Sequence, residues 1–360
     1  MSKKLIVCCD GTWNTANQER DGVPTPTNVV RISGAVAKQS ADGSPQLVYY
    51  REGVGTRPWE RYWGGAFGAG LSRNIMDAYG WLIDHYEAGD QIYLLGFSRG
   101  SFTVRSLSGL IRNCGILRPS EKDRMAQAYD LYRDREGPDA PSAQAFRAAH
   151  AQETRIRFIG VWDTVGELGV PLIGPDWARP LGRLINRRWT FHDTDLSTRV
   201  DGAFQALAID EERSVFEPTL WHQQPESGDQ VLEQVWFTGV HCNVGGGLAD
   251  GSLADLALIW MAAKAHAFGI DFRPGAFEPG VTPPDGVFAV DPDPLAPFTT
   301  SRVGFYRLTR RLHRPIGQAR SEPAGPLDGN ESLAPSVRER YAKNDQYRPP
   351  ELVSYLEAEV

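Results

Sequence analysis

The fold of this chain follows from residues 91–100, which read QIYLLGFSRG. The first half is an apolar strand, and the second half has the spacing Gly-x-Ser-x-Gly, with Ser98 between Gly96 and Gly100. This spacing is typical of a nucleophile elbow, a turn so sharp that only glycine leaves room for the following helix to pass the strand. We therefore expect the Ser98 hydroxyl at the carboxyl edge of a sheet. The backbone N–H of Arg99, at the start of the next helix, is a candidate oxyanion donor.

Apolar strands alternate with helical patterns along the chain, which is typical of a largely parallel sheet with helices on both faces. The expected strands are Lys4–Asp10, Gln46–Arg51, Gln91–Gly96, Arg155–Asp163 and Leu232–His241. The expected helices are Asn28–Gln39, Ser72–Tyr86, Arg99–Asn113, Glu121–Glu136 and Leu253–Phe268. The pattern predicts an α/β fold.

We expect one large domain at residues 1–345, because a chain of 360 residues with 41% hydrophobic content can bury a single large core. Two stretches depart from the alternating pattern. Residues 171–226, rich in Trp, Arg and Pro, are predicted to form a lid or cap insertion over the carboxyl edge of the sheet. Residues 274–334 are predicted to form an irregular connection rich in Pro and Gly, and residues 346–360 a C-terminal segment.

Charge and hydropathy exclude several classes of protein. The formal net charge is −7 and no basic stripe dominates, which argues against a nucleic-acid partner. No apolar stretch reaches the roughly 18 residues that a spanning helix needs, and the first strand is too short for a signal peptide. We expect synthesis in the cytoplasm, with any export proceeding without a signal peptide. Cys8, Cys9, Cys114 and Cys242 show neither a disulfide framework nor zinc spacing, so we expect them reduced.

Two further strand ends carry chemistry at the edge where Ser98 is expected. The fourth strand ends at Asp163 and the fifth at His241, and the carboxyl ends of parallel strands converge on one crevice. The chain order Ser98, Asp163, His241 is that of the α/β hydrolases. In their chemistry the histidine takes the hydroxyl proton, the aspartate fixes the histidine tautomer, and the serine attacks a carbonyl carbon. We predict a triad of these residues in an α/β-hydrolase-like fold, which requires no cofactor.

The histidine and acid roles have competitors. They are His192 for the histidine, and Asp193, Asp195 and Asp210 for the acid. A lone histidine is also often a core residue satisfied by the backbone, and an aspartate after a strand often caps the next turn. The assignment of these two roles therefore stays open at the level of sequence.

The first strand turns at the same edge through Asp10, Gly11 and Thr12. The glycine allows a close backbone approach, so the N–H of Gly11 or Thr12 is a candidate second oxyanion donor. Asp10 would orient this loop by accepting hydrogen bonds from its backbone, bind a cation, or form an Asx-turn without a catalytic part.

Two alternative functions follow from the same crevice. Asp10, Asp163 and His241 are candidates to hold a divalent metal for phosphoester hydrolysis. A catalytically inactive chain would instead bind lipid or protein there.

Seven blocks of sequence carry a resemblance to one family. They read CDGTWN at 9–14, TNV at 27–29, YYREGVGT at 49–56, GFSRG at 96–100, VWDTVG at 161–166, AIDE at 208–211, and VH at 240–241 followed by VGGG at 244–247. Their order, within a span from Leu5 to about Tyr341, resembles an α/β-hydrolase family long catalogued as a domain of unknown function. That family includes the first class of type VI secretion lipase effectors.

The resemblance implies a serine esterase and, in the effector branch, a phospholipase that acts on membrane glycerophospholipids. Carried over by motif, its triad falls on Ser98, Asp163 and His241. The family pattern has Ala where Ser101 stands here, and Asp where Asn243 stands. For an effector, the resemblance also implies an immunity or secretion partner.

Aromatic and cationic side chains bear on the substrate. Trp59, Trp63 and Phe67 are candidates to line an acyl pocket, or to pack in the core. The predicted lid contains aromatic and cationic side chains that are suited to peripheral contact with an anionic lipid surface, or that form a solvated helix face. They are Trp177, Arg179, Arg183, Arg187, Arg188 and Trp189. We predict a serine hydrolase for carboxylic esters, with lipids or phospholipids as the preferred substrates.

Overall fold

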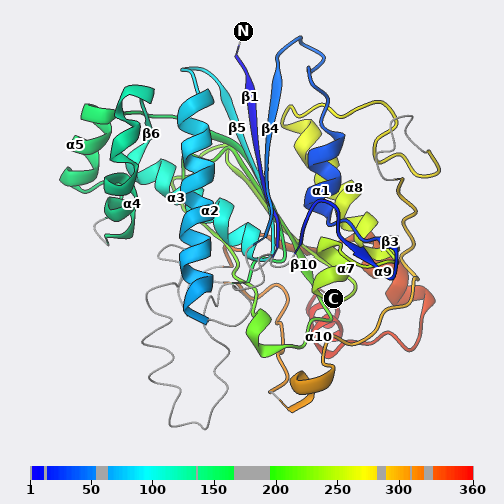
Figure 1. Ribbon diagram of the computed structural model, residues 1–360. Coiled ribbons are helices and arrows are strands. Elements are labelled where there is room, and N and C mark those ends of the chain that lie inside the picture. The colour runs from blue at the N-terminus through cyan, green and yellow to red at the C-terminus, as the bar shows by residue number, and fades with distance from the viewer. Residues whose placement is uncertain are drawn as a thin grey trace.

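A seven-stranded sheet runs through the middle of the computed structural model (Figure 1), which describes residues 2–11, 14–53, 64–134, 137–165, 195–281, 289–308, 310–319 and 327–359. The strand order is β13-β12-β10-β8-β5-β1-β4, and all neighbouring strands are parallel. In that order the strands are Glu331–Leu333, Val231–Phe237, Gly202–Ala208, Ile156–Trp162, Gln91–Phe97, Lys4–Cys9 and Gln46–Arg51. The predicted parallel sheet is confirmed, and its strands all end at one edge.

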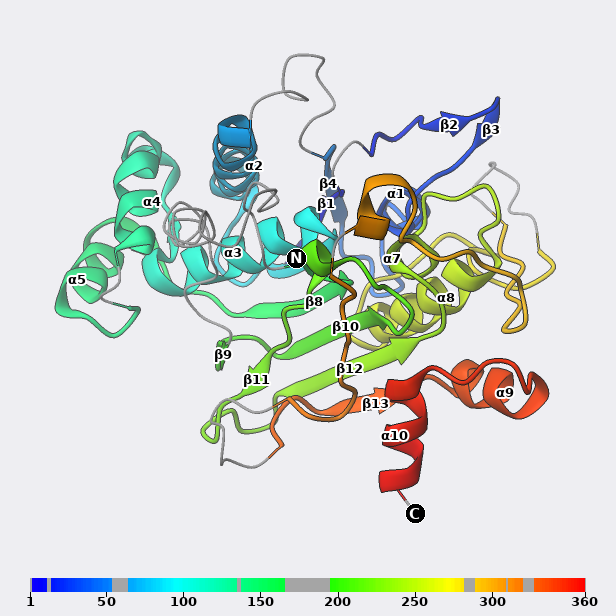
Figure 2. The same ribbon diagram turned by 90° about the horizontal axis from the view of Figure 1, so that it is seen from below.

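Helices cover both faces of this sheet (Figures 1 and 2). One face carries α1 (Asn28–Ala35) and α8 (Ser252–Ala267). The other carries α2 (Gly64–His85) and α3 (Arg99–Cys114), with α4 (Met125–Arg133) and α5 (Pro141–His150) farther out. The helix α7 (His241–Gly245) follows β12 in the chain. Beyond β13, at the end of the sheet opposite β4, lie α9 (Pro335–Lys343) and α10 (Pro350–Ala358) (Figure 2).

Short elements complete the secondary structure of the described residues. The two-stranded pairs are β2 (Glu19–Arg20) with β3 (Val23–Pro24), β6 (Ile116–Leu117) with β7 (Ala151–Gln152), and β9 (Asp195–Leu196) with β11 (His222–Gln223). The 3-10 turns are η2 (Pro119–Arg124), η4 (Ser214–Phe216) and η5 (Gly304–Leu308). In this part of the chain, no helix has the length and hydropathy needed to cross a lipid bilayer.

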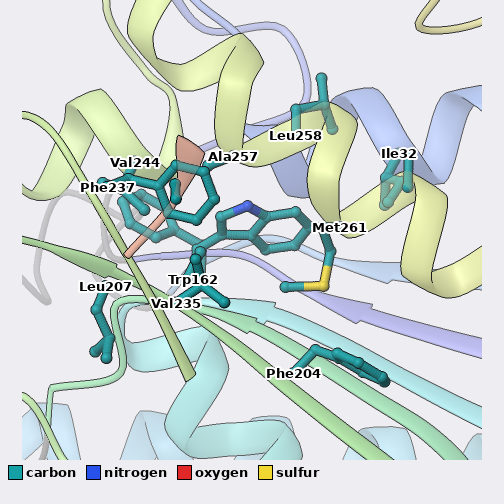
Figure 3. Packing of buried hydrophobic residues seen from close by; sticks show 14 of the residues in the cluster. Ile32, Trp162, Phe204, Leu207, Val235, Phe237, Val244, Ala257, Leu258 and Met261 are labelled. Carbon is teal, nitrogen blue, oxygen red and sulfur yellow. The ribbon is translucent and has the colours of Figure 1, made fainter. Parts of the chain in front are cut away.

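Successive residues of the central strands enter two different cores, because side chains alternate across a sheet. On β1, Leu5 and Val7 pack on the α2–α3 side, whereas Ile6 and Cys8 pack on the α1–α8 side. Figure 3 shows part of the α1–α8 core, with Trp162 and Phe204 of the sheet below α8. Because β1 is buried on both faces, its sequence is a continuous apolar run without alternation.

Two strands of the sheet were not predicted. One is β10, which lies between β8 and β12 and falls inside residues 171–226. The expected lid is therefore wrong for this part, because residues 202–208 are buried throughout and pair on both sides within the sheet. Their apolar run is short and stands in a stretch whose Trp, Arg and Pro content dominates the composition. Residues 171–194 of the predicted lid, with its aromatic and cationic side chains, lie outside the described residues.

The second strand that was not predicted, β13, belongs to residues 274–334, whose other regular element in the described residues is η5. The C-terminal segment is not separate from the domain. Leu352 of α10 is fully buried and belongs to the same core as Val337 of α9. The chain after residue 345 therefore takes part in packing the domain.

Truncation of a core aromatic residue tests this packing. Phe204 is 1% exposed, and its ring centroid lies 5.1 Å from that of Phe158 and 5.3 Å from that of Phe268. Phe204→Ala leaves a cavity between these rings, and we expect it to lower the free energy of unfolding by about 3–5 kcal/mol in urea titrations. Val23→Ala, at a 48% exposed position, serves as the control and should change it by less than about 0.5 kcal/mol. Equal losses in the two variants would contradict the packing.

Candidate active site

Ser98 lies at the turn between β5 and α3 with a backbone φ of 56°, a value that non-glycine residues rarely adopt. Two glycines make this turn possible. A Cβ on Gly96 would lie 2.6 Å from the carbonyl oxygen of Gly100. A Cβ on Gly100 would overlap the carbonyl oxygen of Cys9 in the neighbouring strand. The start of α3 therefore passes β1 and β5 at a distance that only glycine allows.

The first residue of α3 is Arg99. Its backbone N–H belongs to the first turn of the helix, where N–H groups have no acceptor within the helix and the helix dipole favours an anion. Burial lowers the pKa of the Arg99 guanidinium to about 10, with nearby Tyr306 acting in the opposite direction. The residue at the N-terminus of α3 thus directly follows Ser98.

The side chains of Asp163 and His241 meet at the same edge. Asp163 directly follows β8 and has a φ of 42°, and His241 is the first residue of α7. The distance from His241 Nδ1 to Asp163 Oδ2 is 2.6 Å. Because Nδ1 is engaged by the carboxylate, Nε2 is the ring nitrogen left for proton transfer. Both residues are buried, with 0% exposure for Asp163 and 4% for His241.

Two phenylalanines hold the imidazole of His241. Its ring centroid lies 4.7 Å from that of Phe97 and 4.8 Å from that of Phe216, with the second pair edge to face. Phe97 is the last residue of β5 and directly precedes Ser98. The contact with Phe97 therefore places the histidine beside the elbow.

Asp163 is held by a residue that the sequence did not single out. Both terminal nitrogens of Arg314 donate to its carboxylate, Nη1 to Oδ1 at 2.8 Å and Nη2 to Oδ2 at 3.1 Å. Burial alone would raise the pKa of Asp163, but the charge of Arg314 and the bond to His241 outweigh it and hold this pKa well below its usual range. Asp163 is therefore ionised at neutral pH. Arg314 stands in the irregular region 274–334, where no periodicity or motif marks it.

A second carboxylate holds the backbone of His241. Glu211 is 1% exposed and accepts the His241 N–H at 3.3 Å. It pairs with Arg213 and accepts the Ser301 hydroxyl at 2.6 Å. Although burial acts to raise it, the pKa of Glu211 is lowered by Arg213. Glu211 belongs to one of the blocks that carry the family resemblance, but the sequence assigned it no role.

The loop after β1 differs from its prediction in one respect. The Gly11 N–H donates to Asp10 Oδ1 at 2.6 Å, so it is not the free oxyanion donor that we expected. Asp10 Oδ2 accepts the hydroxyls of Thr27 and Tyr50 at 2.7 and 2.9 Å. Burial raises the pKa of Asp10 to about 6, although these hydrogen bonds act to lower it. Thr12, the other predicted donor, lies outside the described residues.

This loop nevertheless borders the elbow. A Cβ added to Gly11 would lie 3.2 Å from the Cβ of Ser98. The hydrogen bonds of Asp10 therefore fix a segment that directly faces the serine, which fits the orienting role among those considered for this carboxylate.

Two of the competing acids, Asp210 and Asp195, lie in the described part of the chain, and their surroundings differ from those of Asp163. Asp210 accepts the Gly239 N–H at 2.7 Å and the Tyr347 hydroxyl at 2.9 Å, and burial raises its pKa to about 6. It fixes the turn that leads into α7. Asp195 is exposed in β9 and lines a separate cavity of about 370 Å³ that contains none of the three triad candidates. His192 and Asp193 lie outside the described residues.

Asn243 stands where the family pattern has Asp, and it stabilises the turn that carries His241. Its Oδ1 accepts the Val240 N–H at 3.1 Å, and its own N–H donates to the Val240 carbonyl at 2.7 Å. An amide oxygen thus caps the start of α7 without adding a charge beside the histidine.

The metal site of the alternative function does not form. Among the residues that the structure describes, no three His, Cys, Asp or Glu side chains are grouped so as to hold a metal ion. Asp10 is committed to hydroxyl and backbone donors, and both oxygens of Asp163 are bound by Arg314. We therefore correct the expectation that Asp10, Asp163 and His241 share a metal.

A cavity of about 480 Å³ adjoins the turn that carries His241; Val240, Cys242 and Asn243 of this turn line it, whereas Ser98, Asp163 and His241 themselves do not. Part of its wall is apolar, with Val240, Leu253, Phe298 and Val303. The lining also holds charged groups of both signs, with Asp250 and with Arg213, which pairs with Glu211. The size and lining of this cavity suit a small, partly apolar ligand. Trp59 and Trp63, and the side chain of Phe67, lie outside what the structure describes.

A single methyl group tests the geometry of the elbow. Gly100→Ala forces α3 away from β1, since the new Cβ would overlap backbone atoms that cannot move independently. We expect a loss of about 3 kcal/mol or more in the free energy of unfolding, or failure to fold. Gly34→Ala is the matched control, because a Cβ at this position of α1 meets nothing within 4 Å. It should leave stability unchanged or raise it by up to about 1 kcal/mol. A neutral Gly100→Ala would contradict the close approach.

The chain is similar to several known proteins. An uncharacterized protein of Saccharomyces cerevisiae, YEL023C, is 25% identical over 248 residues, which are 62% of this chain and 33% of the yeast protein. The chain thus spans about a third of the length of this relative. Among solved structures, an uncharacterized protein from Pseudomonas aeruginosa matches with a TM-score of 0.48 and 18% identity, covering 81% of this chain and 49% of that one. A Tle1 effector bound to the VgrG spike of the type VI secretion system matches with a TM-score of 0.36 and 17% identity, covering 68% and 51%.

The family model for the catalytic domain of Tle1-like phospholipase effectors of the type VI secretion system matches residues 3–264. This range contains the elbow, the aspartate after β8 and the histidine of α7, but it ends before Arg314. The chain therefore belongs to the family of Tle1-like catalytic domains of type VI secretion phospholipase effectors.

Proposed function

We propose that this chain is a serine hydrolase that cleaves carboxylic esters through an acyl-enzyme on Ser98. One observation carries the proposal. His241 Nδ1 lies 2.6 Å from Asp163 Oδ2, and the imidazole packs against Phe97, the residue before Ser98. In this mechanism His241 Nε2 accepts the proton of the Ser98 hydroxyl while Oγ attacks the ester carbonyl. The ionised Asp163 keeps the proton of His241 on Nδ1 and stabilises the imidazolium.

The remaining steps use groups at the start of α3. The Arg99 N–H stabilises the oxyanion of the tetrahedral intermediate, and the helix dipole adds to this effect. His241 returns its proton to the leaving alcohol, which departs and leaves the acyl group on Ser98. Water then gives a proton to His241 and attacks the acyl carbon. When this tetrahedral intermediate collapses, His241 returns the proton to Ser98 Oγ, which restores the serine hydroxyl and releases the acid.

We propose lipid or phospholipid esters as the substrate class. The cavity that adjoins the His241 turn supports this, because apolar side chains such as Phe298 and Val303 can cover an acyl chain. Membership in a family of phospholipase effectors points to the same substrates. It also supports a secretion-machine component as a partner, with an immunity protein as a further expectation for an effector.

The Ser98→Ala variant tests the nucleophile. Turnover of a short-chain p-nitrophenyl ester should fall on the order of 10⁶-fold, because the variant lacks the atom that forms the acyl-enzyme. The fold should be retained, as judged by circular dichroism and the midpoint of urea unfolding. Undiminished turnover in Ser98→Ala would rule the mechanism out.

Ser101→Ala is the matched control. The Ser101 hydroxyl donates to the backbone carbonyl of Gly96 at 2.8 Å, with the Trp162 carbonyl as a second acceptor at 3.1 Å, and Ser101 lies in the first turn of the same helix. The family pattern has Ala at this position, so we expect turnover within about threefold of the wild type, the size of change that a shift of less than 1 kcal/mol produces. A loss in Ser101→Ala equal to that in Ser98→Ala would show that the elbow, and not the nucleophile, had been damaged.

A further inference from the structure

Both terminal nitrogens of the Arg314 guanidinium are held by acceptors, whereas its buried Nε has no hydrogen-bond partner. Arg314 is 2% exposed, and besides the two oxygens of Asp163 it reaches two backbone carbonyls. Nη1 donates to the Ala208 carbonyl at 2.7 Å, and Nη2 donates to the carbonyl of Phe216. A guanidinium presents its donors in a rigid plane that matches a carboxylate. This contact therefore sets both the position and the orientation of the carboxylate of Asp163.

Each oxygen of the Asp163 carboxylate has two donors. Oδ1 accepts from Arg314 and from the Ala208 N–H at 3.1 Å, whereas Oδ2 accepts from Arg314 and from His241. Rotation of the carboxylate would break at least two of these bonds. The hydrogen bonds from Arg314 and from the Ala208 N–H therefore keep Oδ2 as the oxygen that faces His241 Nδ1.

The charge of Arg314 is as important as its shape. Asp163 is fully buried, and a buried carboxylate without a counter-ion tends to take up a proton. A protonated acid would no longer stabilise the imidazolium that forms when His241 takes up the proton of Ser98. The guanidinium removes this possibility because it keeps the carboxylate in its ionised form.

We propose, on the basis of the serine-hydrolase function above, that Arg314 is a positioning residue that holds Asp163 ionised and aligned so that His241 can accept the proton of Ser98. The residue comes from a segment beyond residue 264, where the family match ends. The proposed catalytic apparatus is thus completed by a residue of the irregular region 274–334, and the family-matched range alone would leave Asp163 without its counter-ion.

A pH profile separates this role from a purely structural one. The charged or titratable groups that face the Asp163–His241 pair are Arg314, Glu211 with its partner Arg213, and Cys242. Only the first contacts the carboxylate of Asp163. Without Arg314, the negative charge of Asp163 has no partner cation and favours binding of a proton to the carboxylate or to the imidazole of His241. The active form, in which His241 is neutral and Asp163 is ionised, then appears only at higher pH.

The experiment compares the full-length variants Arg314→Met and Arg314→Lys with the wild type on a short-chain p-nitrophenyl ester between pH 5 and 9. For Arg314→Met we expect kcat to fall about 10²-fold because the acid is misaligned, while KM changes less than about twofold. We also expect the acid limb of kcat/KM to move up by about one pH unit. Arg314→Lys keeps the charge and loses the fork, so it should recover part of kcat and shift the limb less.

Arg31→Met is the matched control. Arg31 forms a buried ion pair with Asp255, with 5% and 4% exposure, and neither residue contacts the proposed triad. Its loss should lower stability in the same way but leave kcat and the acid limb unchanged. The Arg31 variant thus reports what the loss of a buried ion pair does by itself.

Wild-type kcat and an unmoved acid limb in either folded Arg314 variant would overturn the proposal, as would an equal shift in Arg31→Met. If Arg314→Met does not fold, Arg314→Lys decides alone by the same two readouts. The activity of the wild type shows which proposal has failed. If the wild type is active and the Arg314 variants are unaffected, only the role of Arg314 is contradicted. If the wild type hydrolyses no ester, the proposed function itself is contradicted.

Discussion

The site depends on one buried carboxylate, that of Asp163, held between the guanidinium of Arg314 and the imidazole of His241. Burial of a lone charge is costly, and a pair repays that cost only when its remaining hydrogen-bonding groups are also satisfied. The Ala208 N–H and the carbonyls of Ala208 and Phe216 satisfy these groups, except for the buried Nε of Arg314. Breaking the pair by removing one partner typically costs about 3–5 kcal/mol. Stability and the orientation of the histidine are thus coupled through the same atoms.

Two of the five non-glycine residues with positive φ in the described part of the chain lie where the chemistry is proposed. Ser98 and Asp163 both have positive φ, and each directly follows a central strand of the sheet. Such backbone conformations persist only where the surroundings enforce them. At Ser98 the close passage of α3 across β1 does so, and at Asp163 the N–H donates to the Ala206 carbonyl at 2.7 Å while the side chain is fixed by Arg314. The parallel sheet therefore supplies the rigid edge to which these strained residues are attached.

The sequence was most informative where a local rule leaves its mark. The Gly-x-Ser-x-Gly spacing and the continuous apolar runs predicted the elbow and five of the strands, because sterics and two-sided burial constrain those residues directly. The sequence was uninformative where a feature depends on contacts between residues that are far apart in the chain. Nothing in the residues around Arg314 shows that it crosses to Asp163, which is 151 positions away. The short strand β10 was hidden by the composition around it, and the loss of the Gly11 N–H to Asp10 depends on a turn that no motif specifies.

The most direct test of the central claim, that Ser98 is a nucleophile activated by His241 and Asp163, is mass spectrometry of the protein after reaction with a fluorophosphonate. Activated serines react with this reagent, whereas a serine without a neighbouring base does not. We predict one adduct, on the peptide that contains Ser98, with the same yield in the presence of a metal chelator. An unlabelled Ser98 in a folded protein, or ester hydrolysis that a chelator abolishes, would contradict it.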